Sequence, residues 1–181
     1  MSDKKIRTMV MAAVLAALAC VATMVVQIPS PMNGYVNLGD CFVLLSGWLL
    51  GPWYGGAAAG IGSMLTDLLS GYGYYAPGTF IIKGLDALVA ALIFKAMGRT
   101  SVAAIVSGVV GEIIMVVGYS LGRAFIYSTV EYALLKLPFQ ILQAAVGAIV
   151  AMVLCFARGW PTKRYKTWDD AQAPPHVILY W

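Results

Sequence analysis

The sequence has few charged residues and few of the side chains that usually carry out catalysis. Charged residues make up 11% of its 181 positions, against about 25% in a typical soluble domain, while 61% are hydrophobic. The single histidine, His176, lies in the polar C-terminal stretch, so the apolar part of the chain has no histidine for a Ser-His pair or a metalloprotease site. A Walker motif G-x-x-x-x-G-K-[ST] is also missing. These absences argue against an enzyme and against ATP hydrolysis by this chain.

The three cysteines, Cys20, Cys41 and Cys155, have no spacing typical of a disulfide framework or a metal site. They lie in or at the ends of apolar stretches and form no C-x-x-C motif. We therefore expect neither a disulfide nor a metal site, and no cofactor.

Long charge-free stretches dominate the chain, over residues 8-39, 41-66 and 137-157. Crossing a bilayer takes about 20 predominantly apolar residues, so helices can span the membrane there. The pattern predicts an all-α integral membrane bundle of six helices, over 8-27, 38-51, 53-70, 78-97, 101-122 and 137-158. We expect one membrane domain over residues 1-159 and a polar cytoplasmic tail over 160-181.

Pro52 and the glycines around it predict a sharp reversal between the second and third helices. In WLLGPWYGG the proline removes a backbone donor, and the glycines permit a tight turn. Gly47, Gly51 and Gly55 also follow one another at four-residue spacing, which lets helix backbones approach closely in lipid.

Positive charge is concentrated at three places along the chain, which are Lys4, Lys5 and Arg7, then Lys95 and Arg99, then Arg158, Lys163, Arg164 and Lys166. By the positive-inside rule these places are cytoplasmic, and so are both termini. The net charge of +4 then reflects topology and anionic inner-leaflet lipid, so we expect no nucleic-acid partner. The location expected is the plasma membrane of a prokaryotic cell, with several membrane passes.

Apart from Lys95 and Arg158 at the cytoplasmic ends, five charged residues fall in the predicted spans: Asp40, Asp67, Lys83, Asp86 and Glu112. Each charge at the centre of a membrane helix costs about 2.5 to 3.5 kcal/mol on insertion scales, so each must face protein, water or ligand. For Asp40, near a helix start, we favour an interaction with the helix N-terminus over contact with a ligand.

Polar residues of three predicted helices share faces that open towards the outside. Thr79, Lys83 and Asp86 follow i, i+4, i+7. Similar faces carry Gln140 and Gln143 on 137-158 and Glu112 and Tyr119 on 101-122. The inner halves of these helices are apolar, so no polar path crosses the membrane. This favours a one-sided binding pocket over a channel or proton relay.

Several of these residues can instead have a purely structural role. Lys83 and Asp86 can form a self-satisfied pair that joins helices, and Gln140 and Gln143 can be interhelical hydrogen-bond partners. The loops over 28-37 and 70-78 are rich in Pro, Gly and Tyr, so they can fold over a ligand or form the usual interfacial aromatic belt.

The chain resembles the substrate-binding S components of energy-coupling factor (ECF) vitamin transporters over residues 8 to 158. The resemblance is carried by VNLGDCFVLLSGWLLGPWYGGAAAGIGSMLTDLLSGYGYYAPGTFIIKGLDALV, residues 36 to 89, and by an Ala-x-x-x-Ala strip on the first helix. That block looks like the branch associated with hydroxymethylpyrimidine and pyridoxine, sometimes labelled riboflavin-type.

The resemblance implies a subunit that binds a vitamin from outside with high affinity and topples on a transmembrane T component driven by two ABC ATPases. It places the T-component surface at Ala12, Ala13, Ala16 and Ala17, and the gate at the loops 28-37 and 70-78. The substrate-binding candidates are Asp67, Tyr75, Thr79, Lys83, Asp86, Glu112, Tyr119, Gln140 and Gln143.

Three functions compete at this stage. The first is an S component for a small water-soluble vitamin or precursor, pyridoxine or hydroxymethylpyrimidine as first guess and riboflavin or another B vitamin as the alternative. The second is a stand-alone carrier driven by an ion gradient. The third is a membrane scaffold without a ligand, which leaves the Tyr-rich loops unexplained.

Overall fold

One short hairpin interrupts an otherwise helical chain. A computed structural model describes residues 3–30 and 34–157. The elements in order are α1 (Asp3–Val25), β1 (Gln27–Ser30), β2 (Gly34–Asn37), α2 (Gly39–Leu69), α3 (Ala76–Ala96), α4 (Ser101–Gly122), the π-helix η1 (Arg123–Tyr127) and α5 (Val130–Ala157). The all-α class is confirmed apart from the antiparallel hairpin, and the predicted tail 160-181 lies outside the described residues.

The described chain has five α-helical elements rather than the six predicted, because α2 comprises two helical arms on either side of a break at Gly51. At Gly51 the backbone has φ 82° and ψ −179°, a conformation that favours glycine and that suits the residue before a proline. The bend folds α2 back on itself, so that the Ser46 hydroxyl donates to the Gly55 carbonyl at 3.0 Å. The segments predicted over 38-51 and 53-70 are the two arms of this one element.

The last helix begins earlier than predicted, at Val130 instead of residue 137. The predicted spans left residues 123-136 outside any helix, and this segment contains Glu131 and Lys136. In the structure both residues belong to the first turns of α5, with Glu131 exposed and Lys136 buried in the bundle. A buried lysine at this position has consequences for the pocket described below.

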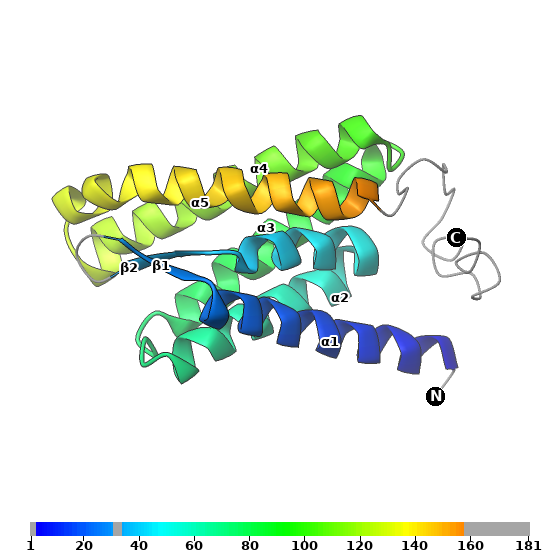
Figure 1. The fold of residues 1–181 in the computed structure, drawn as a ribbon, viewed down its shortest axis with the longest axis horizontal. Helices are drawn as coiled ribbons and strands as arrows, with labels where there is room; N and C mark the ends of the chain where they lie inside the picture. The colour runs from blue at the N-terminus through cyan, green and yellow to red at the C-terminus, as the bar shows by residue number, and fades with distance from the viewer. Residues whose placement is uncertain (1–2, 31–33, 158–181) are drawn as a thin grey trace.

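The helices pack in an order that follows the chain closely. In Figure 1, α1 lies on one side of the bundle, α4 and α5 on the other, and α2 and α3 between them. α2 contacts all the other α-helices and is the centre of the packing. Within the described residues, four segments are long and apolar enough to cross a membrane: Lys5–Val25, Ala76–Ala96, Ser101–Tyr127 and Val130–Ala157.

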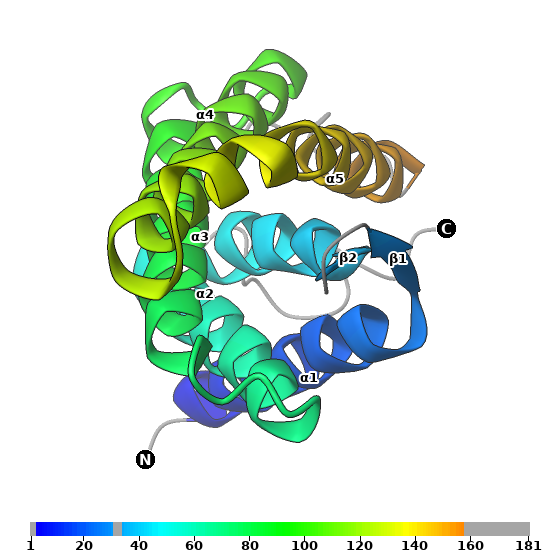
Figure 2. The same ribbon diagram turned by 90° about the vertical axis from the view of Figure 1, so that its left-hand side faces the viewer.

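The two ends of the bundle differ in character. At one end, on the left in Figure 1, lie the β1–β2 hairpin, the turn over residues 70-75 and η1; we call this the hairpin end. At the other lie the start of α1, the bend of α2 and the end of α5. Figure 2 looks onto the hairpin end, where β2 contacts both α1 and α5.

The apolar core fills the half of the bundle away from the hairpin. Trp48 and Phe94 are fully buried there, with ring centroids 5.8 Å apart. The indole N–H of Trp48 donates to the Ser107 hydroxyl at 3.0 Å, so the one polar atom of this ring is satisfied. This packing closes the bundle below the polar residues.

Close approach of α2 and α3 depends on glycine at position 47. A Cβ added to Gly47 would meet the backbone carbonyl oxygen of Ala87, and its distance to the carbonyl carbon would be 3.2 Å. Backbone atoms cannot rotate away as the end of a side chain can. The spacing of glycines predicted close packing, and this contact is an instance of it.

We expect Gly47→Ala to lower the thermal unfolding temperature of the purified protein in detergent. Overpacking costs about 1–3 kcal/mol, which outweighs the gain of about 1 kcal/mol from helix propensity. Gly73→Ala is the matched control, because a Cβ there meets only Leu68 Cδ2 at 3.6 Å. Equal unfolding temperatures for the two variants would contradict this account of the packing.

Candidate functional site

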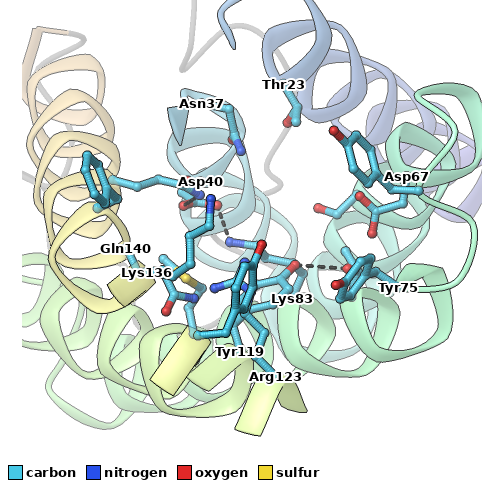
Figure 3. A pocket seen from close by; sticks show the side chains of 17 residues that line it. Thr23, Asn37, Asp40, Asp67, Tyr75, Lys83, Tyr119, Arg123, Lys136 and Gln140 are labelled. Carbon is cyan, nitrogen blue, oxygen red and sulfur yellow. Dashed lines mark hydrogen bonds and ion pairs between the residues drawn. The ribbon is translucent and has the colours of Figure 1, made fainter. Parts of the chain in front are cut away.

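A polar cavity of about 120 Å³ lies at the hairpin end of the bundle. Side chains from all five α-helices, from β2 and from η1 line it, and Figure 3 shows them converging on the cavity. Seven of the nine predicted substrate-binding residues line the cavity, namely Asp67, Tyr75, Thr79, Lys83, Tyr119, Gln140 and Gln143. Helical spacing therefore identified the polar faces that meet there.

An ion pair and a hydrogen bond to it connect three helices at the deep side of the cavity. The Lys83 ammonium on α3 donates to Asp40 Oδ1 on α2, and the Gln143 amide on α5 donates to Asp40 Oδ2 at 2.7 Å. Lys83 is 4% exposed and Asp40 1%. Since both ions are removed from water, their mutual interaction and the added hydrogen bond offset the cost of burial.

The ion pair bears on two interpretations of the sequence. Lys83 pairs with Asp40 rather than with Asp86, whose Oδ1 lies against the α4 backbone where a Cβ on Gly111 would meet it. Asp40 lies in the first turn of α2, as its expected interaction with the helix N-terminus requires, and both of its carboxylate oxygens also accept from other helices.

The wall beside the ion pair is held by hydroxyl groups and aromatic rings. The Tyr119 hydroxyl donates to Thr79 Oγ1 at 3.1 Å, and the Lys83 ammonium lies 5.5 Å from the centroid of the Tyr119 ring. Tyr75 packs on Tyr127 with centroids 4.6 Å apart, which ties the turn over 70-75 to η1. The predicted gate loop over 70-78 thus contacts η1.

Asp86 and Glu112 were predicted to bind substrate, but neither lines the cavity. Each lies farther from the hairpin end along its helix than Lys83 or Tyr119 does. Asp86 is fully buried, Glu112 is 4% exposed, and none of their four carboxylate oxygens has a hydrogen-bond partner in the structure. Lys83 interacts electrostatically with both.

Sequence reasoning missed several lining residues, most clearly Arg123 and Lys136. The predicted spans 101-122 and 137-158 left both of them outside any helix. Their spacing carried a signal, since Arg123 follows Tyr119 by four positions, and Lys136 precedes Gln140 by four. Arg123 therefore continues the predicted polar face of Tyr119, and Lys136 continues that of Gln140.

The four alanines of the α1 strip differ in burial. Ala16 is buried, and a Cβ on Gly62 of α2 would meet its backbone, so this residue belongs to the packing of α1 on α2. Ala12 is partly buried on the same side. Ala13 and Ala17 are exposed and remain available to another chain.

Comparison with known proteins gives a family and a fold. The model of the family "ECF-type riboflavin transporter, S component" matches residues 3–158. A solved structure of the S component of a bacterial ECF transporter superposes with a TM-score of 0.73, covering 88% of this chain and 99% of that one. At 23% sequence identity this likeness concerns the fold.

A curated relative is also similar in sequence. It is an uncharacterized protein from Pyrococcus woesei, 38% identical over 132 residues, which covers 72% of this chain and 86% of the relative.

The ion pair leads to an asymmetric prediction for stability. Lys83→Met leaves the buried Asp40 carboxylate without its cation, whereas Asp40→Asn keeps an amide oxygen that can accept from the Lys83 ammonium. We expect Lys83→Met to cost about 3–5 kcal/mol of unfolding free energy, and Asp40→Asn to cost less. Thermal unfolding in detergent measures both.

The double variant Lys83→Met with Asp40→Asn tests the coupling of the two residues. We expect it to be more stable than Lys83→Met alone, because it no longer leaves the Asp40 charge unpaired. Additive losses from the two substitutions would show that the pair contributes nothing as a pair.

Proposed function

The chain belongs to the family of ECF-type riboflavin transporter S components, and from that premise we propose that it is the membrane-embedded, substrate-binding subunit of an importer for a small water-soluble vitamin or precursor. The single observation that carries the proposal is the polar cavity confined to the hairpin end. Its walls combine charged groups, amides and aromatic rings, which suits a hydroxylated ring compound.

The size of the cavity supports a single-ring substrate. A cavity of 150 Å³ is known to hold a benzene molecule, and this one measures about 120 Å³, so every candidate vitamin requires the cavity to widen and the smallest require it least. Pyridoxine and hydroxymethylpyrimidine are therefore our first candidates. Riboflavin, with three fused rings, is the alternative and requires the hairpin and the turn over 70-75 to move apart.

The proposed orientation places the hairpin end outside the cell and both termini in the cytoplasm. Lys4, Lys5 and Arg7 precede the apolar part of α1, and Lys95 and Arg99 connect α3 with α4, all at the end away from the cavity. In this orientation the cavity receives its substrate from outside.

Delivery to the cytoplasm requires partner chains in this proposal. Since the packed core around Trp48 closes the bundle below the cavity, we infer that substrate is released when the whole subunit topples on a T component powered by two ATPases. The exposed alanines Ala13 and Ala17, with the apolar side chains Val10 and Val14 beside them, are our candidate surface for that partner.

A gradient-driven carrier is the competing function, and uptake distinguishes the two. Our proposal expects cells that hold this chain alone to bind the substrate without accumulating it, and cells that also hold the T component and ATPases to accumulate it. Accumulation by this chain alone, abolished by dissipating the proton or sodium gradient, would favour the carrier.

The first test is ligand retention by the purified protein. The chain is incubated with a mixture of B vitamins and precursors, washed and denatured, and the released compounds are identified by mass spectrometry. We expect one ring compound to be retained. Retention of none by folded protein would contradict the proposed function.

For the retained compound we expect Asp67→Asn to weaken binding about tenfold or more, as for loss of a charged hydrogen bond. Asp67 lines the cavity, and its Oδ2 is buried without a partner. Asp3→Asn, an identical change at an exposed residue of α1, is the control. Titration calorimetry measures both, and equal affinities would remove Asp67 from the site.

A further inference from the structure

Two cations line the outer part of the cavity, close to the hairpin end. Arg123 begins η1, and Lys136 lies in the second turn of α5. In Figure 3 both side chains extend towards the cavity, in front of the Lys83–Asp40 pair. The charge of Arg123 acts on Lys136, so the fold places two like charges within range of one another.

The hydrogen-bonding capacity of Arg123 is incompletely used. Its Nη1 is buried and has no hydrogen-bond partner in the structure. Its guanidinium carbon lies 5.4 Å from the centroid of the Tyr119 ring, so an aromatic face holds the group in place. A buried charged donor without an acceptor is unfavourable, and a ligand acceptor at this position would remove the deficit.

Three cations and two carboxylates line the cavity. Lys83 forms its ion pair with Asp40, and the other lining charges are Arg123, Lys136 and Asp67. Lys136 is 4% exposed, and its ammonium lies 5.6 Å from the centroid of the Tyr132 ring. Two neighbouring cations, each packed near an aromatic ring, favour binding of an anion. Arginine in particular can donate two parallel hydrogen bonds to the oxygens of a carboxylate or a phosphate.

The backbone also fixes the position of Arg123. α4 widens there into a π-helical turn, in which the N–H of Ser128 donates to the Arg123 carbonyl at 2.8 Å. Such π-helical turns are frequent at functional sites. Tyr127 of the same turn packs on Tyr75, so η1 is held against the opposite loop.

We propose that the ligand of this cavity carries an anionic group, a carboxylate or a phosphate ester, that Arg123 binds through Nη1 with Lys136 as the second positive charge. The ring of the ligand lies deeper, beside the Lys83–Asp40–Gln143 network. This inference rests on the proposed function of the cavity and adds the charge of its substrate.

The test compares pairs of ring compounds that differ only in the anionic group. The probes are pyridoxine and pyridoxine 5′-phosphate, hydroxymethylpyrimidine and its monophosphate, and riboflavin and riboflavin 5′-phosphate, each titrated calorimetrically into the full-length protein. We expect the anionic member of at least one pair to bind at least tenfold tighter than the neutral member.

Variants assign this preference to the cations. We expect Arg123→Gln to abolish the preference, so that the anionic and neutral members of the pair bind with similar affinity. Arg123→Lys keeps the charge but loses the fork, so we expect it to retain part of the preference. Lys95→Gln, which removes a cation at the other end of the bundle, is the control and should leave the preference intact.

The outcomes separate this inference from the function on which it rests. Tight binding of neutral members, with no gain from the anionic group and no effect of Arg123→Gln, would overturn the inference and leave the binding function in place. Loss of the preference on adding phosphatidylglycerol to the micelles would assign the cations to a lipid headgroup and overturn it as well. Binding of no probe would count against both proposals.

Discussion

The buried ion pair between Lys83 and Asp40 is the interaction on which the arrangement of the site depends. It connects α2 with α3, and Gln143 adds α5 through the second carboxylate oxygen. Neither ion has access to bulk water, so the partners cannot separate without leaving a bare charge in the bundle. The relative positions of three helices, and hence the shape of the cavity between them, follow from satisfying these two charges together.

The pair can form only because the helices approach closely enough, and small residues provide that approach. Gly47 lies against the Ala87 backbone, and Gly147 leaves room for the Asp40 side chain, since a Cβ there would come within 2.7 Å of Asp40 Cβ. Below these contacts lies the apolar core around Trp48, whose indole N–H is satisfied by Ser107. Polar chemistry is thereby restricted to one end, which is the physical basis for a subunit that receives substrate from one side.

The sequence predicted much of this fold because membrane helices obey strong local constraints. Charge-free length located the spans, and helical spacing located polar faces such as Thr79 and Lys83 on α3. Pairing could not be read in the same way, since Lys83 reaches a residue 43 positions away and not its neighbour Asp86. The π-helical turn at Arg123 and the early start of α5 were missed because charge near a span was interpreted as a loop, whereas both cations turn inward.

The unsatisfied atoms of the cavity say more about its ligand than the satisfied ones do. Lys83 and Asp40 already satisfy each other, so a ligand gains little by displacing either. Asp67 Oδ2 and Arg123 Nη1 are both buried without partners, and both residues line the cavity. A ligand that donates to the first and accepts from the second would satisfy an acceptor and a donor at once. A ring bearing a hydroxyl or amino donor and an anionic acceptor has that pattern, and a neutral ring has only half of it.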